Sequence, residues 1–463
     1  MSDSLFNEFD PVSSKQWKQK IQFDLKGADY NETLIWDSPE DIHVKPFYHS
    51  DDFKTLPEVS DHRGTQWDIC QEIYVSSVTQ ANTKALNVLN RGAESILFVV
   101  PIEAVSIYHL LKNINLTITT IHFKLHFISE EFIIRLSNYL KHKNATVYVN
   151  IDLIGNLVKS GNWYYNLAQD HDILNSIMTH SEVFKSTVGV DMSLYQNAGA
   201  NMIQQLAYGM AHANEYLNHY KDSFATKATD AFILNFTVAI GPNYFFEIAK
   251  IRALRILYRT LASEYDVALE CHIFAIPSQR NMSIYDYNNN MLRTTTECMS
   301  ALLGSADTIC NSPYDILYHK DNEFGERISR NQLLILKHES YFDKVGNPTD
   351  GAYYIENLTS QLAEKALELF KDIESNGGFL KQLKEGTIQR KIKESASKEQ
   401  NRFDAIEDVL LGTNKHVNAK DQMKNELELY PFVKTNKRKT LIEPIIPKRL
   451  AEKLEQQRLK NEN

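Results

Sequence analysis

Apolar positions along most of this chain follow two alternating patterns. From about residue 65, short runs rich in Val, Ile, Phe and Leu alternate with longer stretches whose apolar residues recur near i, i+3, i+4 and i+7. The first pattern is typical of buried strands and the second of amphipathic helices. The expected strands are Ser95–Val100, Lys124–Ile128, Thr146–Ile154, Thr187–Met192, Phe232–Ile240, Ala268–Ala275 and Asp307–Asn311, and the expected helices include Ala198–Tyr220 and Tyr244–Tyr265.

Repeated strand–helix units of this length predict a parallel sheet, and seven or eight of them favour an α/β fold, the closed (β/α)8 TIM barrel. An open doubly wound sheet is the alternative. The expected strand Phe232–Ile240 has a bulky apolar face and a second face of Ile233, Asn235, Thr237 and Ala239. We expect the bulky face to meet the helices, which leaves a partly polar lumen.

The two ends of the chain differ from this centre. The segment Lys20–Tyr48 sets apolar anchors among polar residues without the periodicity of a core of its own, so it is expected to lie along another surface. Beyond about residue 355 come long helical patterns, a Lys/Arg-rich connector near 434–439, and a helix at 448–460 that is hydrophilic almost all round. The predicted parts are an extended N-terminal segment (1–64), a barrel (65–360) and a helical C-terminal extension and tail (361–463).

Composition narrows the classes of function. The formal net charge of −9 argues against a nucleic-acid-binding body, which usually presents a basic face. The four cysteines form no CxxC pair, which favours reduced thiols in a cytoplasmic protein. No stretch approaches the roughly 20 apolar residues of a membrane helix, and the first residues do not read as a signal peptide. We therefore expect a cytoplasmic protein with neither nucleic acid nor membrane as a partner.

General catalytic and metal-binding motifs are missing. The sequence contains no GxGxxG, no P-loop and no GxSxG. His122 and His126 are four residues apart in a strand-like stretch, where residues at that spacing lie some ~13 Å apart on one face. That distance is too long for one zinc ion, so no metal site is expected.

Several longer stretches carry a family resemblance. They are FFEIAKIRALR (Phe245–Arg255), DYNNNMLRTTTE (Asp286–Glu297), RISRNQLLIL (Arg327–Leu336) and the turn NPTDGAYY (Asn347–Tyr354). Their order and spacing resemble the methylmalonyl-CoA mutase family, and the resemblance runs from about residue 20 to 459. It implies a radical, adenosylcobalamin-dependent isomerase built on a TIM barrel.

The family's cobalamin-binding element is not found. Corrinoid binding in this family uses a flavodoxin-like domain with an Asp-x-His-x-x-Gly loop. His43 follows Asp41 by two residues, but Val44-Lys45-Pro46 comes next, without the glycine. The resemblance therefore implies no flavodoxin-like domain and no cofactor bound by this chain itself.

The family's catalytic loop is altered as well. Catalytic relatives carry a His-Cys-Gln-Thr-Ser-Gly-Trp-Ser run whose histidine hydrogen-bonds the substrate thioester. Here His272 lies about two residues out of register, and the apolar run Ile273–Pro277 replaces the polar set. Gln196 falls on the family's substrate glutamine, but Asn197 replaces the neighbouring glutamate. No catalytic residue is expected, and His272 and Gln196 are vestigial candidates with structural roles as the alternative.

Three further residues are candidates for substrate contact. Arg280 and Asn281 stand in a stretch that looks like the Arg-x-Met-Thr of the family's small subunits, and Arg293 follows in the Asp286–Glu297 segment. An arginine in such a place serves equally well to pair with a carboxylate or to cap a helix. Both roles stay open for these residues.

The chain as a whole resembles the small (beta), non-catalytic subunit of heterodimeric members of this family. That resemblance implies a large (alpha) catalytic partner that binds adenosylcobalamin, interconverts (R)-methylmalonyl-CoA and succinyl-CoA, and is wrapped by the N-terminal segment. Three alternatives remain. They are an acyl-CoA mutase barrel that is catalytic in trans with a separate cobalamin-binding subunit, a ligand-free scaffold barrel, and a stand-alone lyase or aldolase, which predicts a lysine or carboxylate cluster at strand ends.

Overall fold

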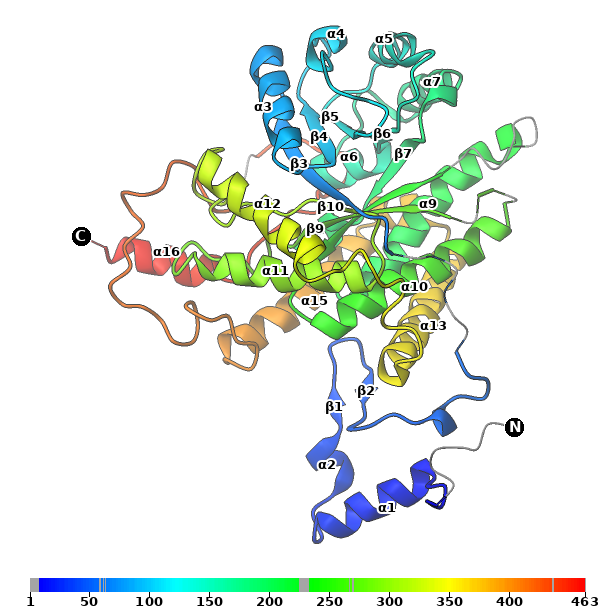
Figure 1. Ribbon diagram of the computed structural model, residues 1–463, viewed down its shortest axis with the longest axis vertical. Coiled ribbons are helices and arrows are strands. Elements are labelled where there is room, and N and C mark those ends of the chain that lie inside the picture. The colour runs from blue at the N-terminus through cyan, green and yellow to red at the C-terminus, as the bar shows by residue number, and fades with distance from the viewer. Residues whose placement is uncertain are drawn as a thin grey trace.

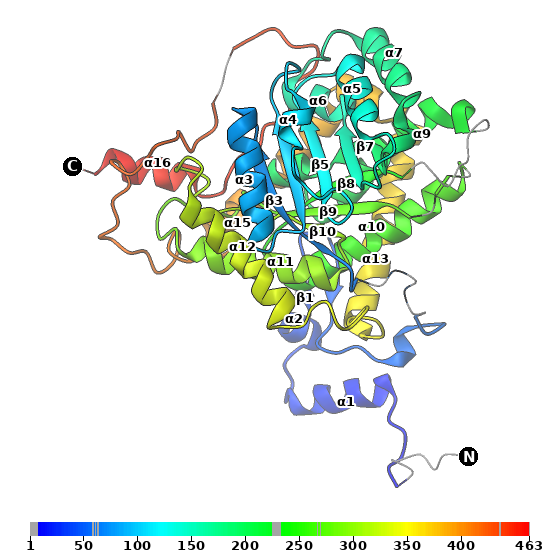
Figure 2. The ribbon, with the colours of Figure 1, turned by 45° about the horizontal axis from the view of Figure 1, so that its top comes forward.

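The computed structural model describes residues 8–57, 60, 62, 64–224, 233–265, 267–268, 270–434 and 437–462. Its centre is a closed barrel of parallel strands in the order β10-β3-β4-β5-β6-β7-β8-β9, with helices around it (Figures 1 and 2). The expected (β/α)8 barrel is thereby confirmed. The strands are β3 Asp68–Tyr74, β4 Ser95–Val100, β5 Thr120–Leu125, β6 Val147–Ile151, β7 Ser186–Asp191, β8 Asn235–Ile240, β9 His272–Pro277 and β10 Thr308–Ile309.

Amphipathic helices follow the strands and cover the barrel, and their apolar faces join its outward-facing residues in one continuous core. None of the helices in the described part of the chain is long and apolar enough to cross a membrane. The helices are α3 Val78–Asn90, α4 Ile107–Leu110, α5 Glu130–Leu140, α6 Leu153–Ser160, α7 Leu167–Met178, α8 Ser193–Asn197, α9 Met202–Phe224, α10 Tyr244–Ser263, α11 Asn289–Leu303 and α12 Glu323–His338.

The faces of β8 point as the sequence predicts. Phe236 packs on Tyr258 of α10, with ring centroids 5.5 Å apart, and belongs to the core between barrel and helices. Asn235 points into the lumen, where its amide donates to Asn150 Oδ1 at 2.5 Å. Phe232, the first residue of the expected strand, lies outside the described residues. The lumen is therefore partly polar at this strand.

Two strands depart from the sequence expectation. The apolar pattern predicts no strand at β3 and places another at Lys124–Ile128, whereas β5 ends at Leu125. Both strands carry polar residues on their lumen side, including Glu72 in β3 and His122 in β5. Polar inward positions interrupt the apolar run by which a buried parallel strand is usually recognised.

The helix expected at Ala198–Tyr220 begins four residues later than predicted, and a separate short helix precedes it. Helix α8 ends at Asn197 and α9 begins at Met202. Between them Gly199 has a φ of +98°, and a Cβ at this position would lie 2.5 Å from Cβ of Ala396. Glycine suits this break because it adopts positive φ freely and leaves room for the neighbouring helix.

The N-terminal segment forms an arm that projects from the barrel (Figure 1). It contains α1 Ser14–Asp24, α2 Tyr30–Leu34, the antiparallel hairpin β1 Trp36–Asp37 and β2 His43–Val44, and the 3-10 turn η1 Ser50–Asp52. The hairpin joins the arm to the barrel core, where Ile42 is fully buried and the ring of Trp36 packs on that of Phe246, with centroids 5.7 Å apart. Helix α1 contains no buried residue.

The C-terminal extension packs on the barrel. Residues of α13 Tyr353–Ser375, α14 Phe379–Lys384 and α15 Thr387–Asp404 belong to the same apolar core as the strands. The hydrophilic helix α16 Glu452–Lys460 is held by polar contacts. Glu455, 1% exposed, pairs with Arg449 at 2.6 Å and accepts from the backbone N–H of Ile284 at 2.9 Å. A helix that is hydrophilic almost all round needs ion pairs or a partner to stay folded, and these contacts supply the ion pairs.

Candidate functional site

Aromatic side chains fill the barrel lumen. The rings of His122 and Tyr148 stack with centroids 4.7 Å apart, and His272 and Phe274, from β9, lie 5.4 and 4.9 Å from His122. All four residues are buried. Strands β5 and β9 are not neighbours in the barrel, so these contacts cross its axis. These rings therefore occupy the space around the barrel axis at this level.

His272 is the first residue of β9 and so lies at the amino end of the barrel strands. Its Nδ1 lies 2.5 Å from Asn235 Oδ1, and its Nε2 lies 3.1 Å from Thr308 Oγ1. Asn235 Oδ1 only accepts, so Nδ1–H donates and Nε2 accepts from the threonine hydroxyl. In (β/α)8 enzymes the catalytic groups sit at the carboxyl ends of the strands. Both ring nitrogens of His272 are already used within the barrel.

The stability of the folded protein at acid pH should depend on the burial of His272. Burial lowers the pKa of this imidazole from 6.5 to about 4. The unfolded chain then binds a proton at higher pH than the folded chain, so stability present above pH 6.5 is lost as the pH falls toward 4. We expect this residue to contribute about 3 kcal/mol of that loss. Urea unfolding at several pH values should show a correspondingly shallower decline for His272→Gln, and an unchanged slope would contradict the assignment.

Gln196 belongs to a buried polar network after β7. Its Oε1 accepts from Lys250 Nζ at 2.8 Å, and its Nε2 donates to Glu247 Oε1 at 3.2 Å. Lys250 and Glu247 form an ion pair at 2.6 Å with both side chains buried. Lys250 also donates to Gln205 at 3.0 Å and to the carbonyl of Ala239 at 2.8 Å. Gln196 thus stabilises a buried charge pair.

The three candidates for substrate contact lie on the loop after β9 and on α11. Arg280 donates to Glu399 and to the carbonyl of Lys448, both at 2.6 Å, which ties the loop to the C-terminal extension. Asn281 donates to Glu297 at 2.7 Å, and burial raises the pKa of that carboxyl to about 8. Arg293 donates to Asn290 at 2.7 Å and to the carbonyl of Leu411 at 2.6 Å. Each candidate is therefore engaged within the chain.

The barrel does not bring all the candidates together. Gln196, Arg280, Asn281 and Arg293 follow the carboxyl ends of β7 and β9. His272 opens β9, and the strand spans six residues, so about 17 Å separates it from the loop that holds Arg280. The arrangement has no shared centre in which His272 could act with the others.

A charged group that sequence reasoning missed lies at the carboxyl end of the lumen. Lys124 of β5 pairs with Asp191 of β7 at 3.0 Å, and Glu72 of β3 is exposed nearby. No pattern along the chain connects these positions, because only barrel closure brings them together. Asp191 raises the pKa of Lys124, so its amine stays protonated. Aldolase chemistry through a Schiff base needs a neutral amine, which this pair disfavours.

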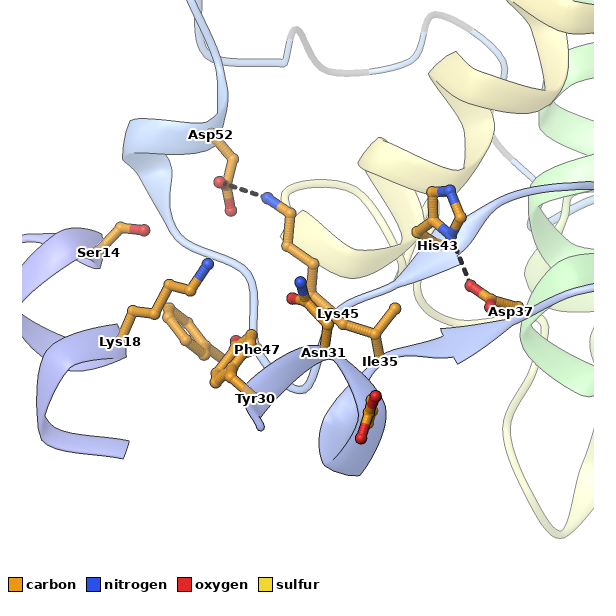
Figure 3. A pocket seen from close by; sticks show the side chains of 11 residues that line it. Ser14, Lys18, Tyr30, Asn31, Ile35, Asp37, His43, Lys45, Phe47 and Asp52 are labelled. Carbon is orange, nitrogen blue, oxygen red and sulfur yellow. Dashed lines mark hydrogen bonds and ion pairs between the residues drawn. The ribbon is translucent and has the colours of Figure 1, made fainter. Parts of the chain in front are cut away.

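The N-terminal arm encloses a pocket of about 570 Å³ (Figure 3). Its walls come from α1, α2 and the hairpin, and Lys45 pairs with Asp52 at 2.7 Å on its rim. Beside it, apolar side chains face outward: Phe23 is 78% exposed, and Trp17 and Trp36 are about half exposed. Leu34 and Phe47, which belong to the same segment, are half-buried. The arm therefore presents large apolar side chains to solvent.

Metal-binding clusters are absent from the described ranges, where no group of three or more His, Cys, Asp or Glu side chains is placed to hold an ion. His122 is fully buried among aromatic rings, whereas His126 is exposed beyond the end of β5. The two histidines that the sequence spacing singled out are therefore in different environments.

Known proteins resemble this chain over most of its length. A family model described as methylmalonyl-CoA mutase matches residues 110–460. The methylmalonyl-CoA mutase small subunit of Porphyromonas gingivalis is 33% identical over 446 residues, which cover 90% of this chain and 71% of that protein. The large subunit of the same organism is 33% identical over 242 residues, 50% of this chain and 33% of that protein.

A methylmalonyl-CoA mutase of Rhizobium meliloti is 26% identical over 454 residues, which cover 87% of this chain and 64% of that protein. The chain thus spans about two thirds of the length of the relatives that it matches over most of its own length.

Proposed function

Because the chain belongs to the methylmalonyl-CoA mutase family, we propose that it is the non-catalytic small subunit of a heterodimeric mutase. Its large partner would bind adenosylcobalamin and interconvert (R)-methylmalonyl-CoA and succinyl-CoA. In that assembly this chain stabilises the partner. All four cysteines are free and buried, as is typical of cytoplasmic proteins.

The main support for this proposal is the way in which His272 is buried and hydrogen-bonded inside the barrel. The family's substrate-binding histidine corresponds most nearly to this residue, which here opens β9 and has both ring nitrogens engaged by Asn235 and Thr308. Aromatic rings fill the lumen beside it. A group that is buried, neutral and bonded on both sides does not reach a thioester carbonyl at the opposite end of the barrel.

The described residues do not fit a corrinoid. His43 comes nearest to the family's cobalt-ligating loop, but it stands on the exposed hairpin strand β2 with its Nδ1 2.5 Å from Asp37. Besides the barrel, the described part of the chain holds only that two-stranded hairpin as a sheet. We therefore place adenosylcobalamin in the partner and assign this chain no step in the radical chemistry.

A partner is supported by the relatives and by the arm. Small and large mutase subunits occur together in Porphyromonas gingivalis. The arm projects from the barrel (Figure 1), and it exposes Phe23, Trp17 and Trp36, of which Trp36 also packs against Phe246 of the barrel core. Large exposed apolar side chains on a projecting segment are typical of an interface with another protein.

The alternatives differ in where substrate binds. A barrel catalytic in trans needs Arg280, Asn281 or Arg293 to contact the acyl-CoA, whereas each of them is engaged within this chain. A ligand-free scaffold needs no substrate contact at all. Binding of CoA by the isolated chain would exclude this alternative.

The experiment is co-purification of this chain with a candidate large subunit, followed by a mutase assay of each chain alone and of the pair. We expect a stable heterodimer and no turnover by this chain alone. Turnover by this chain with a separate cobalamin-binding protein and no second barrel would favour catalysis in trans.

A further inference from the structure

A second pocket, of about 370 Å³, lies at the carboxyl end of the barrel. Gln279 and Arg280 reach it from the loop after β9, and Ile316 and Leu317 reach it from the connection after β10. Strands β9 and β10 are the seventh and eighth of the barrel in chain order. Asn197, at the end of α8, also lines the pocket, and the remaining walls come from the C-terminal extension, at 429–434 and 447–452.

The pocket is cationic in a chain whose formal net charge is −9. Four of its lining side chains are basic, and two of these are neutralised, since Arg280 pairs with Glu399 and Arg449 with Glu455, each at 2.6 Å. Lys434 and Lys448 are exposed and form no ion pair with the described residues. Two ammonium groups therefore remain available to an anion.

The single acidic side chain in the lining is hydrogen-bonded to backbone N–H groups. Glu452 is 5% exposed, and its carboxylate accepts from the N–H groups of Arg449 at 2.9 Å and Val433 at 3.2 Å. Its carboxylate forms no ion pair with Lys434 or Lys448, so both ammonium groups stay free to contact an anion.

One wall of the pocket is apolar. Tyr430 is 58% exposed and carries Lys434 over its ring, with the ammonium 5.9 Å from the centroid. Leu429, Pro431 and Pro447 line the same region. A flat ring stacked on Tyr430 would bring an attached anionic group toward Lys434 and Lys448.

The position within the fold points to the chemistry of the anion. In (β/α)8 proteins the loops after the seventh and eighth strands frequently bind the phosphate group of a ligand, beside the N-terminus of a short extra helix. This pocket has the same strands, and α16 begins at Glu452 on its edge. We propose that it binds a small organic phosphate monoester, with the phosphoryl group between Lys434 and Lys448 and the organic part on Tyr430.

Calorimetric titration of the full chain with AMP and with inorganic phosphate at low ionic strength tests the proposal. We expect saturable AMP binding with a dissociation constant below about 1 mM, weakening as salt is added. Lys434→Gln and Lys448→Gln should each weaken AMP binding about five- to tenfold. Tyr430→Ala should reduce AMP binding to the level of inorganic phosphate.

The matched control is Lys112→Gln, an exposed lysine between α4 and β5 that should leave AMP binding unchanged. Absence of saturable AMP binding up to about 10 mM would overturn the proposal. So would AMP binding that both lysine variants leave intact. Equal affinity for phosphate and AMP in the wild type would overturn the assignment of an organic phosphate.

Discussion

Replacing Lys250 with methionine is expected to destabilise the folded chain by about 3–5 kcal/mol. The ammonium is fully buried and joins Glu247, Gln196, Gln205 and the carbonyl of Ala239. Methionine fills similar space but leaves the Glu247 carboxylate buried without its counter-ion. Urea unfolding, followed by circular dichroism, measures the loss of unfolding free energy.

Two further variants separate the buried pair from ordinary surface charge. The double variant Lys250→Met with Glu247→Gln should recover roughly half of the loss, because the amide still accepts from the Gly241 N–H that Glu247 now binds at 2.8 Å. Lys20→Met breaks an exposed ion pair of 2.7 Å within α1 and should cost less than about 0.5 kcal/mol. A loss below about 1 kcal/mol for Lys250→Met would show that the network is not a stability element.

Removing the strip Lys20–Tyr48 should abolish the heterodimer while the barrel stays folded. The strip holds Phe23 and Trp36, which are 78% and 48% exposed. It also holds Ile42, which is buried in the core, so the deletion should carry a moderate stability cost of about 2–4 kcal/mol. Size-exclusion chromatography with the partner, beside thermal melting of each chain, measures both effects.

A point variant avoids that stability cost. Phe23→Ser should raise the dissociation constant of the heterodimer about thirtyfold or more without changing the melting temperature, as expected for an exposed anchor that becomes buried in an interface. Ile118→Ser is the matched control, since Ile118 is 77% exposed on the barrel. If Phe23→Ser pairs with the partner as tightly as Ile118→Ser does, the arm is not the interface.

The apolar pattern predicted most of the barrel because outward residues such as Phe236 and Val238 must be buried under helices. It failed where the lumen side was polar, at β3 with Glu72 and at β5 with His122 and Lys124. A strand is recognised in a sequence by its apolar residues, so a strand with one charged face is easily missed.

The candidate residues were identified by family resemblance, and their surroundings could not be predicted. The sequence placed His272 near a catalytic position, but only the closed barrel shows it packed against His122 and Tyr148. Likewise, the partners of Arg280 come from residues more than a hundred positions away, Glu399 and Lys448. Long-range pairing of this kind leaves no signal in a single sequence.

Turnover of the reconstituted heterodimer carrying His272→Ala in this chain tests the central claim most directly. The imidazole is buried at the amino end of β9 and bonded to Asn235 and Thr308. If this subunit is non-catalytic, the rate should stay within about twofold of wild type, apart from a stability cost of about 1–3 kcal/mol. A rate loss of about a hundredfold or more, with assembly and melting temperature intact, would contradict the account and place catalysis in this barrel.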